Sequence, residues 1–368
     1  MTRKVPFLDL RVTDPQLLQQ LLGAVETVLR HGRLVMGPEV AEFEASLSRN
    51  LDGRLVAGVG SGTDALLLGL KGLGIGAGDE VITTSLSWIA TANAIALTGA
   101  TPVFADIRDD LNLDPASVER LVTSRTRAIL AVHYTGKIAD MTALNELAQA
   151  KSLLVVEDAA QAYGASLHGK PAGAWGDIGC FSMNPMKVLA AYGEAGAIAT
   201  ESEDVYQKLL ALRYNGTVNR EFCIEPSLNG RLDTIQAALL QIQLGRLDAI
   251  IARRRAIAAR YAELLAGCVE VPVESSGQRD VYYTYTIKAD QRDRLMEYLT
   301  AQGIETKIQH PILMPDQQPY STASNDGYPM ARQLAGRILC IPANEKLSDA
   351  DVDYVALHIR TYYGANSS

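Results

Sequence analysis

Short apolar runs alternate with helical patterns through about the first 200 residues, and this alternation constrains the fold more than any other feature. Each run has the length of a strand and the continuous apolar character of a strand buried on both faces. Strands of this kind separated by helices predict an α/β fold, with a mostly parallel sheet covered on both sides. The expected strands are Glu80–Thr84, Pro102–Asp106, Ala128–His133, Leu153–Glu157, Ile178–Ser182 and Ala195–Thr200, and expected helices include Ser87–Leu97, Asp114–Thr123 and Met141–Ala150.

A long helical segment and a change of pattern follow. From Leu232 to about Leu265 apolar residues recur at helical spacing without proline, and Gly245 marks a candidate break. The remaining chain has a strand-like segment at 281–289 and helical patterns near 292–302 and from about 348, which suit a smaller α+β domain. We therefore predict a large domain over residues 1–245, which includes the N-terminal segment, and a small C-terminal domain over residues 246–368.

Composition and charge exclude several classes of protein. The formal net charge of −8 argues against a nucleic-acid binder, because phosphate recognition needs a basic surface. The N-terminus lacks the apolar core of a signal peptide, and no run approaches the roughly 18 apolar residues of a membrane span. The four cysteines are scattered and indicate reduced, mostly buried thiols, and the five histidines form no metal pattern. We expect a cytoplasmic protein that binds neither a metal, nor a membrane, nor nucleic acid.

An acidic residue stands where one of the expected strands ends. Asp158 directly follows the apolar run LLVVE, and parallel sheets place their ligand sites at the carboxyl ends of strands. A carboxylate there can pair with the ring nitrogen of pyridoxal phosphate and keep that ring able to accept electrons. The alternative is that Asp158 caps a helix over residues 159–165.

Lys187 lies in a setting that is unusual for a lysine. It is flanked by Met186, Val188 and Leu189, and an apolar environment favours the neutral amine that reacts with carbonyl groups. The alternative is a surface lysine with an extended side chain. Asp158 upstream and the glycine-rich segment 193–196 downstream favour a cofactor lysine.

The order of these segments supports a family resemblance. EDAAQA at 157–162, CFS at 180–182, Lys187 and GEAGA at 193–197 follow one another in an order similar to that of the DegT–DnrJ–StrS family, the pyridoxal phosphate-dependent sugar aminotransferases of fold type I. The segments VPFLDL, GVGSGTDALLLGL, TGATPVFADI and NGRLDTIQAALL, as well as the late LSDADVDYV, fall in the family's order too. The resemblance implies a fold type I large domain, which resembles that of aspartate aminotransferase, and a pyridoxal 5′-phosphate cofactor that alternates with its pyridoxamine form.

The resemblance also implies roles for individual residues. Lys187 carries the cofactor as a Schiff base, Asp158 pairs with the pyridine nitrogen, and Gln161 donates to the ring hydroxyl. Trp88 stacks on the ring, and Ser182 binds the phosphate together with the start of the helix at Gly62, whose free N–H groups suit an anion. The implied catalytic residues are Lys187 and Asp158, and the implied cofactor-binding set is Gly62, Thr63, Asp64, Trp88, Asp158, Gln161, Ser182, Lys187 and Asn229.

Three further residues are candidates for binding across subunits or to substrate. Asn229 resembles a family asparagine that reaches the phosphate from the neighbouring subunit, which implies a homodimer with shared active sites. Arg231 is a candidate for binding the carboxylate of the amino donor, because a planar guanidinium can donate two hydrogen bonds to a carboxylate. The alternative is that Arg231 forms a structural ion pair. His310 faces the substrate or, alternatively, packs within its loop.

The predicted enzyme is a transaminase with ping-pong kinetics. It moves an amino group from glutamate or glutamine to a keto-sugar, which we expect to be nucleotide-linked. The residues around Lys187 and at Gly230 depart from the family pattern, and they leave the acceptor as the least determined part. The alternatives are a keto-cyclitol aminotransferase, a sugar dehydratase, which Lys187 argues against, and a non-catalytic cofactor-binding sensor. The absence of a strand-turn-helix glycine fingerprint argues against a dinucleotide-dependent oxidoreductase.

Overall fold

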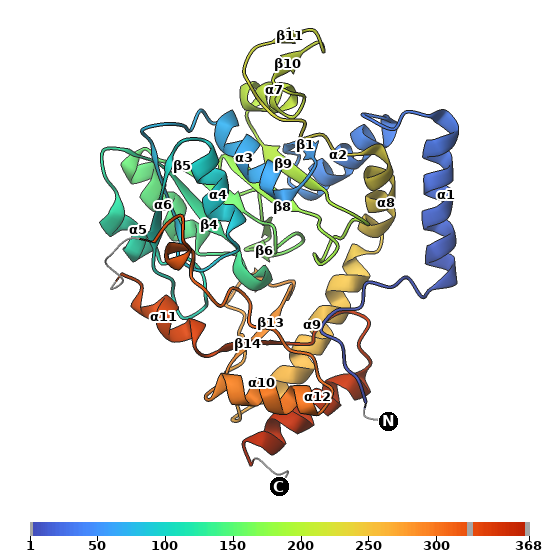
Figure 1. Ribbon diagram of the computed structural model, residues 1–368, viewed down its shortest axis with the longest axis vertical. Helices are drawn as coiled ribbons and strands as arrows, with labels where there is room; N and C mark the ends of the chain where they lie inside the picture. The colour runs from blue at the N-terminus through green and yellow to red at the C-terminus, as the bar shows by residue number, and fades with distance from the viewer. Residues whose placement is uncertain (1–2, 322–326, 365–368) are drawn as a thin grey trace.

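A seven-stranded sheet forms the centre of the larger part of the molecule in the computed structural model, which describes residues 3–321 and 327–364 (Figure 1). The strand order is β1-β9-β8-β5-β4-β2-β3, and β9 alone in this sheet runs antiparallel to its neighbours. The sheet strands are β1 (Leu55–Val59), β2 (Glu80–Thr84), β3 (Thr101–Ala105), β4 (Thr126–Val132), β5 (Leu154–Asp158), β8 (Ile178–Ser182) and β9 (Gly196–Thr200).

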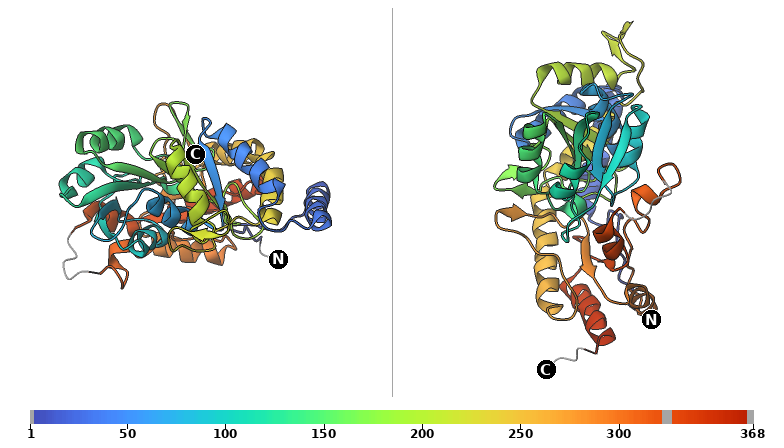
Figure 2. Two further views of the ribbon diagram at one scale, coloured as in Figure 1. Left: turned by 90° about the horizontal axis from the view of Figure 1, so that it is seen from above. Right: turned by 90° about the vertical axis from the view of Figure 1, so that its left-hand side faces the viewer.

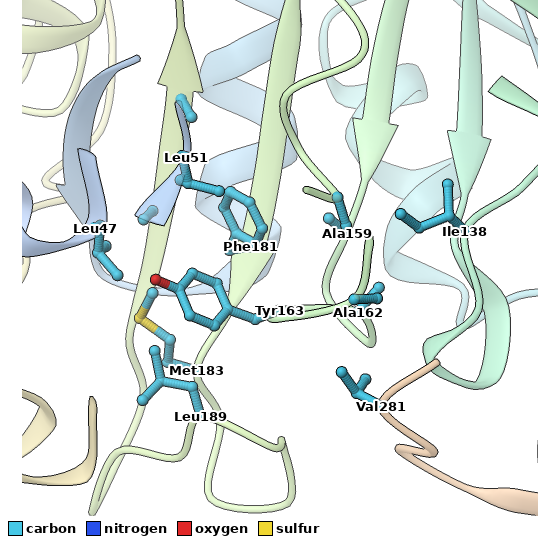
Figure 3. Close-up of a cluster of buried hydrophobic side chains, with 14 of the residues drawn as sticks. Leu47, Leu51, Ile138, Ala159, Ala162, Tyr163, Phe181, Met183, Leu189 and Val281 are labelled. Atoms are coloured by element: carbon cyan, nitrogen blue, oxygen red, sulfur yellow. The ribbon is translucent and has the colours of Figure 1, made fainter. Parts of the chain in front are cut away.

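Helices cover both faces of this sheet. Because neighbouring strand residues point to opposite faces, Val155 and Val156 of β5 belong to two different buried clusters. Figure 3 shows part of the first cluster, in which the rings of Tyr163 and Phe181 meet edge to face with centroids 5.3 Å apart. The first cluster includes residues of α2 (Pro38–Asn50), α5 (Pro115–Leu121) and α6 (Met141–Lys151), and the second includes residues of α3 (Gly62–Gly72), α4 (Ala90–Leu97) and α7 (Glu203–Leu212).

The expected α/β fold is confirmed, and each strand expected before residue 200 is present within one or two residues. The aspartate caps also form, because Asp114 and Asp140 accept hydrogen bonds from the first-turn amides of α5 and α6. Strand β1 was not anticipated, since Ala57 and Gly58 give it little strand propensity of its own. Residues 159–165 form turns and no helix, so the alternative in which Asp158 caps a helix there was wrong.

The long helical segment is two helices, α8 (Thr234–Leu244) and α9 (Leu247–Leu264), separated at Gly245 and Arg246. Helix α9 extends away from the large sheet and packs in a third buried cluster with the smaller, C-terminal elements (Figure 1). Their α+β character confirms the expected class of this part, whereas the domain boundary at 245/246 stays a prediction. The elements are β13 (Tyr285–Lys288), β14 (Ile338–Ile341), α10 (Arg292–Ala301), α11 (Pro329–Ala335) and α12 (Asp349–Tyr362).

Two elements stand at the margins of the molecule. Helix α1 (Pro15–His31) packs on α8 through Leu17, Leu21 and Leu239. The hairpin of β10 (Thr217–Val218) and β11 (Phe222–Cys223) projects beyond α7 (Figure 2). The remaining short elements are β6 (Ser166–Leu167), β7 (Lys170–Pro171), β12 (Gln278–Arg279) and the 3-10 turns Tyr134–Gly136 and Met314–Asp316.

All four cysteines are free thiols, but the expectation that most are buried holds only for Cys180 and Cys340. Cys268 is half-buried and Cys223 is exposed. Within the described part of the chain, no helix has both the length and the apolar character needed to cross a membrane.

Candidate active site

A cavity of about 520 Å³ opens at the carboxyl ends of the central strands. Asp158 ends β5, Ser182 ends β8, and Gly62 begins the helix that follows β1, so three separate strands deliver residues to it. This is the edge at which parallel sheets bind ligands. The cavity lining brings together these residues of the expected set: Gly62, Thr63, Trp88, Asp158, Gln161, Ser182, Lys187 and His310.

Asp158 is buried at the floor of this cavity. Thr91 donates its hydroxyl hydrogen to one carboxylate oxygen over 2.8 Å, and the Ala160 amide donates to the other over 3.2 Å. Burial raises the pKa of Asp158 above its usual range, while the two hydrogen bonds and the charge of Lys187 oppose that shift. A carboxylate in this position is stabilised by any cationic group that enters the cavity, and a protonated ring nitrogen is such a group.

Gln161 is oriented by an unusual backbone turn. Its Oε1 accepts from the backbone amide of Thr135 over 2.8 Å, so its NH2 group remains available as a donor. Thr135 has a φ of 62°, which is rare for a β-branched residue. The hydrogen bond from this turn holds the Gln161 side chain in place, so its NH2 group is a fixed donor three residues from Asp158.

The start of α3 makes a narrow anion cradle. Ser61 caps the helix by accepting from the Asp64 amide over 3.0 Å, and the amides of Gly62 and Thr63 have no partner within the helix. A Cβ on Gly62 would lie 2.5 Å from the Cβ of Ser182, so only glycine lets α3 approach β8 this closely. The cradle therefore offers two backbone donors and the Ser182 hydroxyl to one anionic group.

Lys187 borders the same cavity from the loop after β8. Its Nζ lies 4.5 Å from the centre of the Tyr283 ring, a cation–π contact. Met186 and Lys187 also line a second cavity, of about 460 Å³, on the side of the N-terminal segment. Trp88 is 62% exposed and lines the cavity, so it is not a core tryptophan.

Three expected residues are not in the cavity lining. The amide of Asp64 is used by the Ser61 cap, and Asn229 is exposed in the segment that follows the β10–β11 hairpin. The Arg231 guanidinium stacks on Tyr214, with its carbon 4.1 Å from the ring centre, and forms no ion pair with a described carboxylate. The binding roles of these residues stay predictions.

The sequence did not predict three other residues that line the cavity: Thr91, Tyr283 and Lys307. Thr91 carried a usable signal, because it is a hydroxyl residue four positions after Ser87 in a segment that was expected to be helical. In the structure Ser87 lies before α4, and the two hydroxyl oxygens are 3.0 Å apart. Tyr283 and Lys307 carried none, since each reaches the cavity from a segment more than 100 residues from Asp158 in sequence.

The residues that surround the cavity fit pyridoxal phosphate. A buried carboxylate, an amide donor, a flat exposed indole, a lysine and an anion cradle surround one cavity, and together they match a cationic ring with a phosphate at one end. The strand order and this cavity define a pyridoxal phosphate enzyme of fold type I.

Comparison with known proteins gives the family. The DegT/DnrJ/EryC1/StrS aminotransferase family matches residues 15–360, and the chain belongs to it. A dTDP-3-amino-3,4,6-trideoxy-alpha-D-glucose transaminase of Streptomyces venezuelae is 40% identical over 94% of this chain and 93% of its own. The crystal structure of S. venezuelae DesV in complex with a ketimine intermediate is 38% identical, covers 100% of both chains and has a TM-score of 0.96.

A second solved relative bears on the cofactor. The crystal structure of ntda from Bacillus subtilis with bound cofactor PMP is 31% identical, covers 98% of this chain and 85% of its own, and has a TM-score of 0.92. The expectations of an aminotransferase, of fold type I and of pyridoxal phosphate as the cofactor are therefore confirmed.

Proposed function

We propose that this enzyme transfers the amino group of glutamate or glutamine to the keto group of a nucleotide-linked sugar. The observation that carries the proposal is the cavity in which Lys187 and the buried Asp158 meet, in a chain 40% identical to a transaminase named for a dTDP-linked amino sugar.

Lys187, Asp158 and Gln161 have separate roles in the proposed reaction. Bound pyridoxal phosphate supplies an electron sink for the carbanion at the reacting carbon and stores the amino group between the two half-reactions. Lys187 Nζ holds the cofactor before substrate binds and then moves the proton at the reacting carbon. Asp158 accepts a hydrogen bond from the protonated ring nitrogen, and Gln161 donates from its NH2 group to the ring hydroxyl.

The remaining residues hold the cofactor in place. The amides of Gly62 and Thr63 and the hydroxyl of Ser182 bind the phosphate, and Trp88 covers the ring. Asp64, expected beside the phosphate, and Arg231, expected at the carboxylate of the donor, belong to the same proposal. His310 completes the expected substrate contacts.

Cofactor spectroscopy tests the proposed donor and acceptor separately. We expect glutamate or glutamine to convert the yellow pyridoxal form to the pyridoxamine form within one turnover, and a dTDP- or UDP-linked keto-sugar to reverse the change. Product analysis then detects the amino sugar by mass. If a keto-cyclitol reverses the change and nucleotide-linked keto-sugars do not, the proposed acceptor is wrong.

We also propose a homodimer with shared sites. Its support is that Asn229, expected at the phosphate, is exposed outside the cavity of its own chain, and that the nearby β10–β11 hairpin projects from the surface (Figure 1).

We also propose that the enzyme is cytoplasmic, because its free thiols stay reduced in that compartment.

Asn229→Ala tests the homodimer with shared sites. A hydrogen bond to a charged group is worth roughly 1.5–3 kcal/mol, so we expect the Kd for pyridoxal phosphate to rise about ten- to a hundredfold. Equilibrium dialysis measures the Kd, and sedimentation must show that the variant keeps the wild-type oligomeric state. Asn50→Ala serves as the matched control, because Asn50 is exposed at the end of α2, away from the hairpin, with a helical backbone that accepts alanine. Unchanged cofactor affinity, or a monomeric wild-type protein, would contradict the shared site.

A further inference from the structure

The Lys187 amine lies over the face of an aromatic ring. Its Nζ is 4.5 Å from the centre of the Tyr283 ring, and no described group forms a hydrogen bond or an ion pair with it. Both side chains are half-buried and line the candidate active site, so water screens the contact only in part. The face of an aromatic ring attracts an ammonium but has no such attraction for a neutral amine.

The backbone of Tyr283 is held against the turn at Thr135 and Gly136. The Val281 amide donates to the Gly136 carbonyl oxygen over 3.1 Å. A Cβ on Gly136 would lie 2.8 Å from the Tyr283 amide nitrogen and 3.1 Å from the Gln161 carbonyl oxygen, so only glycine allows this approach. Because the Thr135 amide also donates to Gln161 Oε1, one turn positions the Tyr283 ring and the Gln161 donor relative to each other.

A buried guanidinium holds the same segment from another side. Arg254 is 3% exposed, and its Nη1 donates to the carbonyl oxygens of Tyr282 and Tyr283 over 3.2 and 3.4 Å. Its Nη2 donates to the carboxylate of Glu345 over 2.9 Å. Tyr282 has a φ of 49°, a left-handed conformation that is costly for a bulky residue. The surrounding structure therefore fixes the place of the Tyr283 ring against backbone strain.

The other basic groups of the cavity do not stabilise an ammonium on Lys187. Burial, together with the charges of Lys187 and Lys307, lowers the pKa of His310 to about 3, so the His310 ring is uncharged at neutral pH. Lys307 shares the cavity, and its positive charge repels a second ammonium there. A charged Lys187 therefore depends on attractive neighbours.

Two carboxylates line the cavity, and each has another partner. Asp158 interacts with the charge of Lys187, but its carboxylate is also the proposed partner of the protonated ring nitrogen of the cofactor. Glu194 accepts a hydrogen bond from the side-chain amide of Asn184 over 2.7 Å. The Tyr283 ring is the neighbour that the rest of the proposed reaction leaves to Lys187.

We propose that Tyr283 is a positioning residue that holds the Lys187 ammonium beside the reacting carbon while the amine carries the proton. The inference rests on the proposed role of Lys187 and names a partner for its charged form. In each half-reaction the amine takes a proton from one carbon and returns it to another, so it gains and then loses one positive charge. An aromatic face attracts that charge and cannot accept the proton, whereas a carboxylate in its place could retain it.

Two substitutions separate the ring from its hydroxyl in single-turnover spectroscopy. We expect Tyr283→Leu to lower the rates of both half-reactions about three- to thirtyfold and to change the apparent Kd of either substrate less than about twofold, because both half-reactions use the same amine. Tyr283→Phe keeps the ring and is the matched control, with rates within about twofold of the wild type. An equal loss in Tyr283→Phe would assign the effect to the hydroxyl, and a loss in one half-reaction alone would assign it to a substrate contact. Either result would overturn the inference.

A series of fluorinated rings tests the contact without turnover. Phenylalanine with one, two or three ring fluorines at position 283 keeps its shape and attracts a cation progressively less. The pyridoxamine form of the enzyme leaves the Lys187 amine free, and mass spectrometry of its peptide measures acylation of that amine across pH. The midpoint of this pH dependence should fall along the series by about half a unit or more, because the neutral amine is the reactive form.

An unchanged midpoint along the series would overturn the inference even if Tyr283→Leu did not fold. The proposed function fails in a different way. A wild-type enzyme that reacts with the donor and aminates no keto-sugar would overturn the proposed acceptor, while the donor half-reaction and the fluorine series would still decide the role of Tyr283.

Discussion

Lys187→Ala should lose transamination by about a thousandfold or more, because the proposed attachment point and the proton carrier at the reacting carbon are the same amine. The variant should still bind pyridoxal phosphate through the cradle at Gly62, Thr63 and Ser182, since none of these contacts involves Lys187. Borohydride should fix the cofactor covalently to the wild-type protein and leave it removable from the variant. Mass spectrometry of the reduced proteins distinguishes the two.

Lys307→Ala provides the matched control, because Lys307 is a second lysine at the same cavity. Its reduced form should still carry the cofactor, attached at Lys187. If the Lys187 variant kept a covalent cofactor after reduction while the Lys307 variant lost it, the attachment point would be Lys307. Activity of the Lys187 variant within about tenfold of the wild type would likewise contradict the assigned role.

The parts of the fold that are encoded locally were predictable. Strands β4 and β5 are continuous apolar runs, and their burial on both faces follows from that pattern. Strand β1 lacks such a run, because Ala57 and Gly58 interrupt it, and its place is set by pairing with β9. The antiparallel direction of β9 is set by its pairing with β1 and β8 and not by its own apolar residues.

The same distinction holds at the candidate site. Asp158 and Ser182 could be placed because strands deliver their last residues to one sheet edge. Tyr283 reaches Lys187 only because the turn at Gly136 packs against it, with the Tyr283 amide 2.8 Å from where a Gly136 Cβ would stand. Contacts of this kind depend on how distant segments pack, and neither periodicity nor spacing contains them.

Asp158→Asn should lower transamination about a hundredfold or more while it makes the cofactor-free protein more stable at neutral pH. The activity falls because the ring nitrogen loses the negative charge that holds its proton, and removal of one electrostatic partner in a buried site typically costs roughly 10²- to 10³-fold. The amide is nearly isosteric with the carboxylate. Thr91 and Ala160 can keep hydrogen bonds to it, so the site should not collapse.

The predicted gain in stability follows from the sign of the pKa shift. Burial is the largest influence on Asp158 and raises its pKa in the folded state above the unfolded value of about 3.9. The folded state then binds more protons than the unfolded state between those two pKa values, so stability falls as pH rises through that window. At neutral pH the wild-type apoprotein bears this cost, and the uncharged amide of the Asp158→Asn variant does not.

Thermal unfolding of the two cofactor-free proteins across pH measures this difference. The variant should unfold at a higher temperature at pH 7, and the difference should shrink as pH falls and vanish below about 3, where the wild-type carboxyl is protonated in both states. Thr91→Val is the control with the opposite sign, because loss of its hydrogen bond removes an interaction that lowers the pKa of Asp158 and should destabilise the protein. If the Asp158→Asn variant were less stable than wild type at pH 7, the charge of Asp158 would stabilise the folded state. In that case Asp158 would be a structural cap on the turn at Ala160, and the charge held ready for the cofactor would have to lie elsewhere in the cavity.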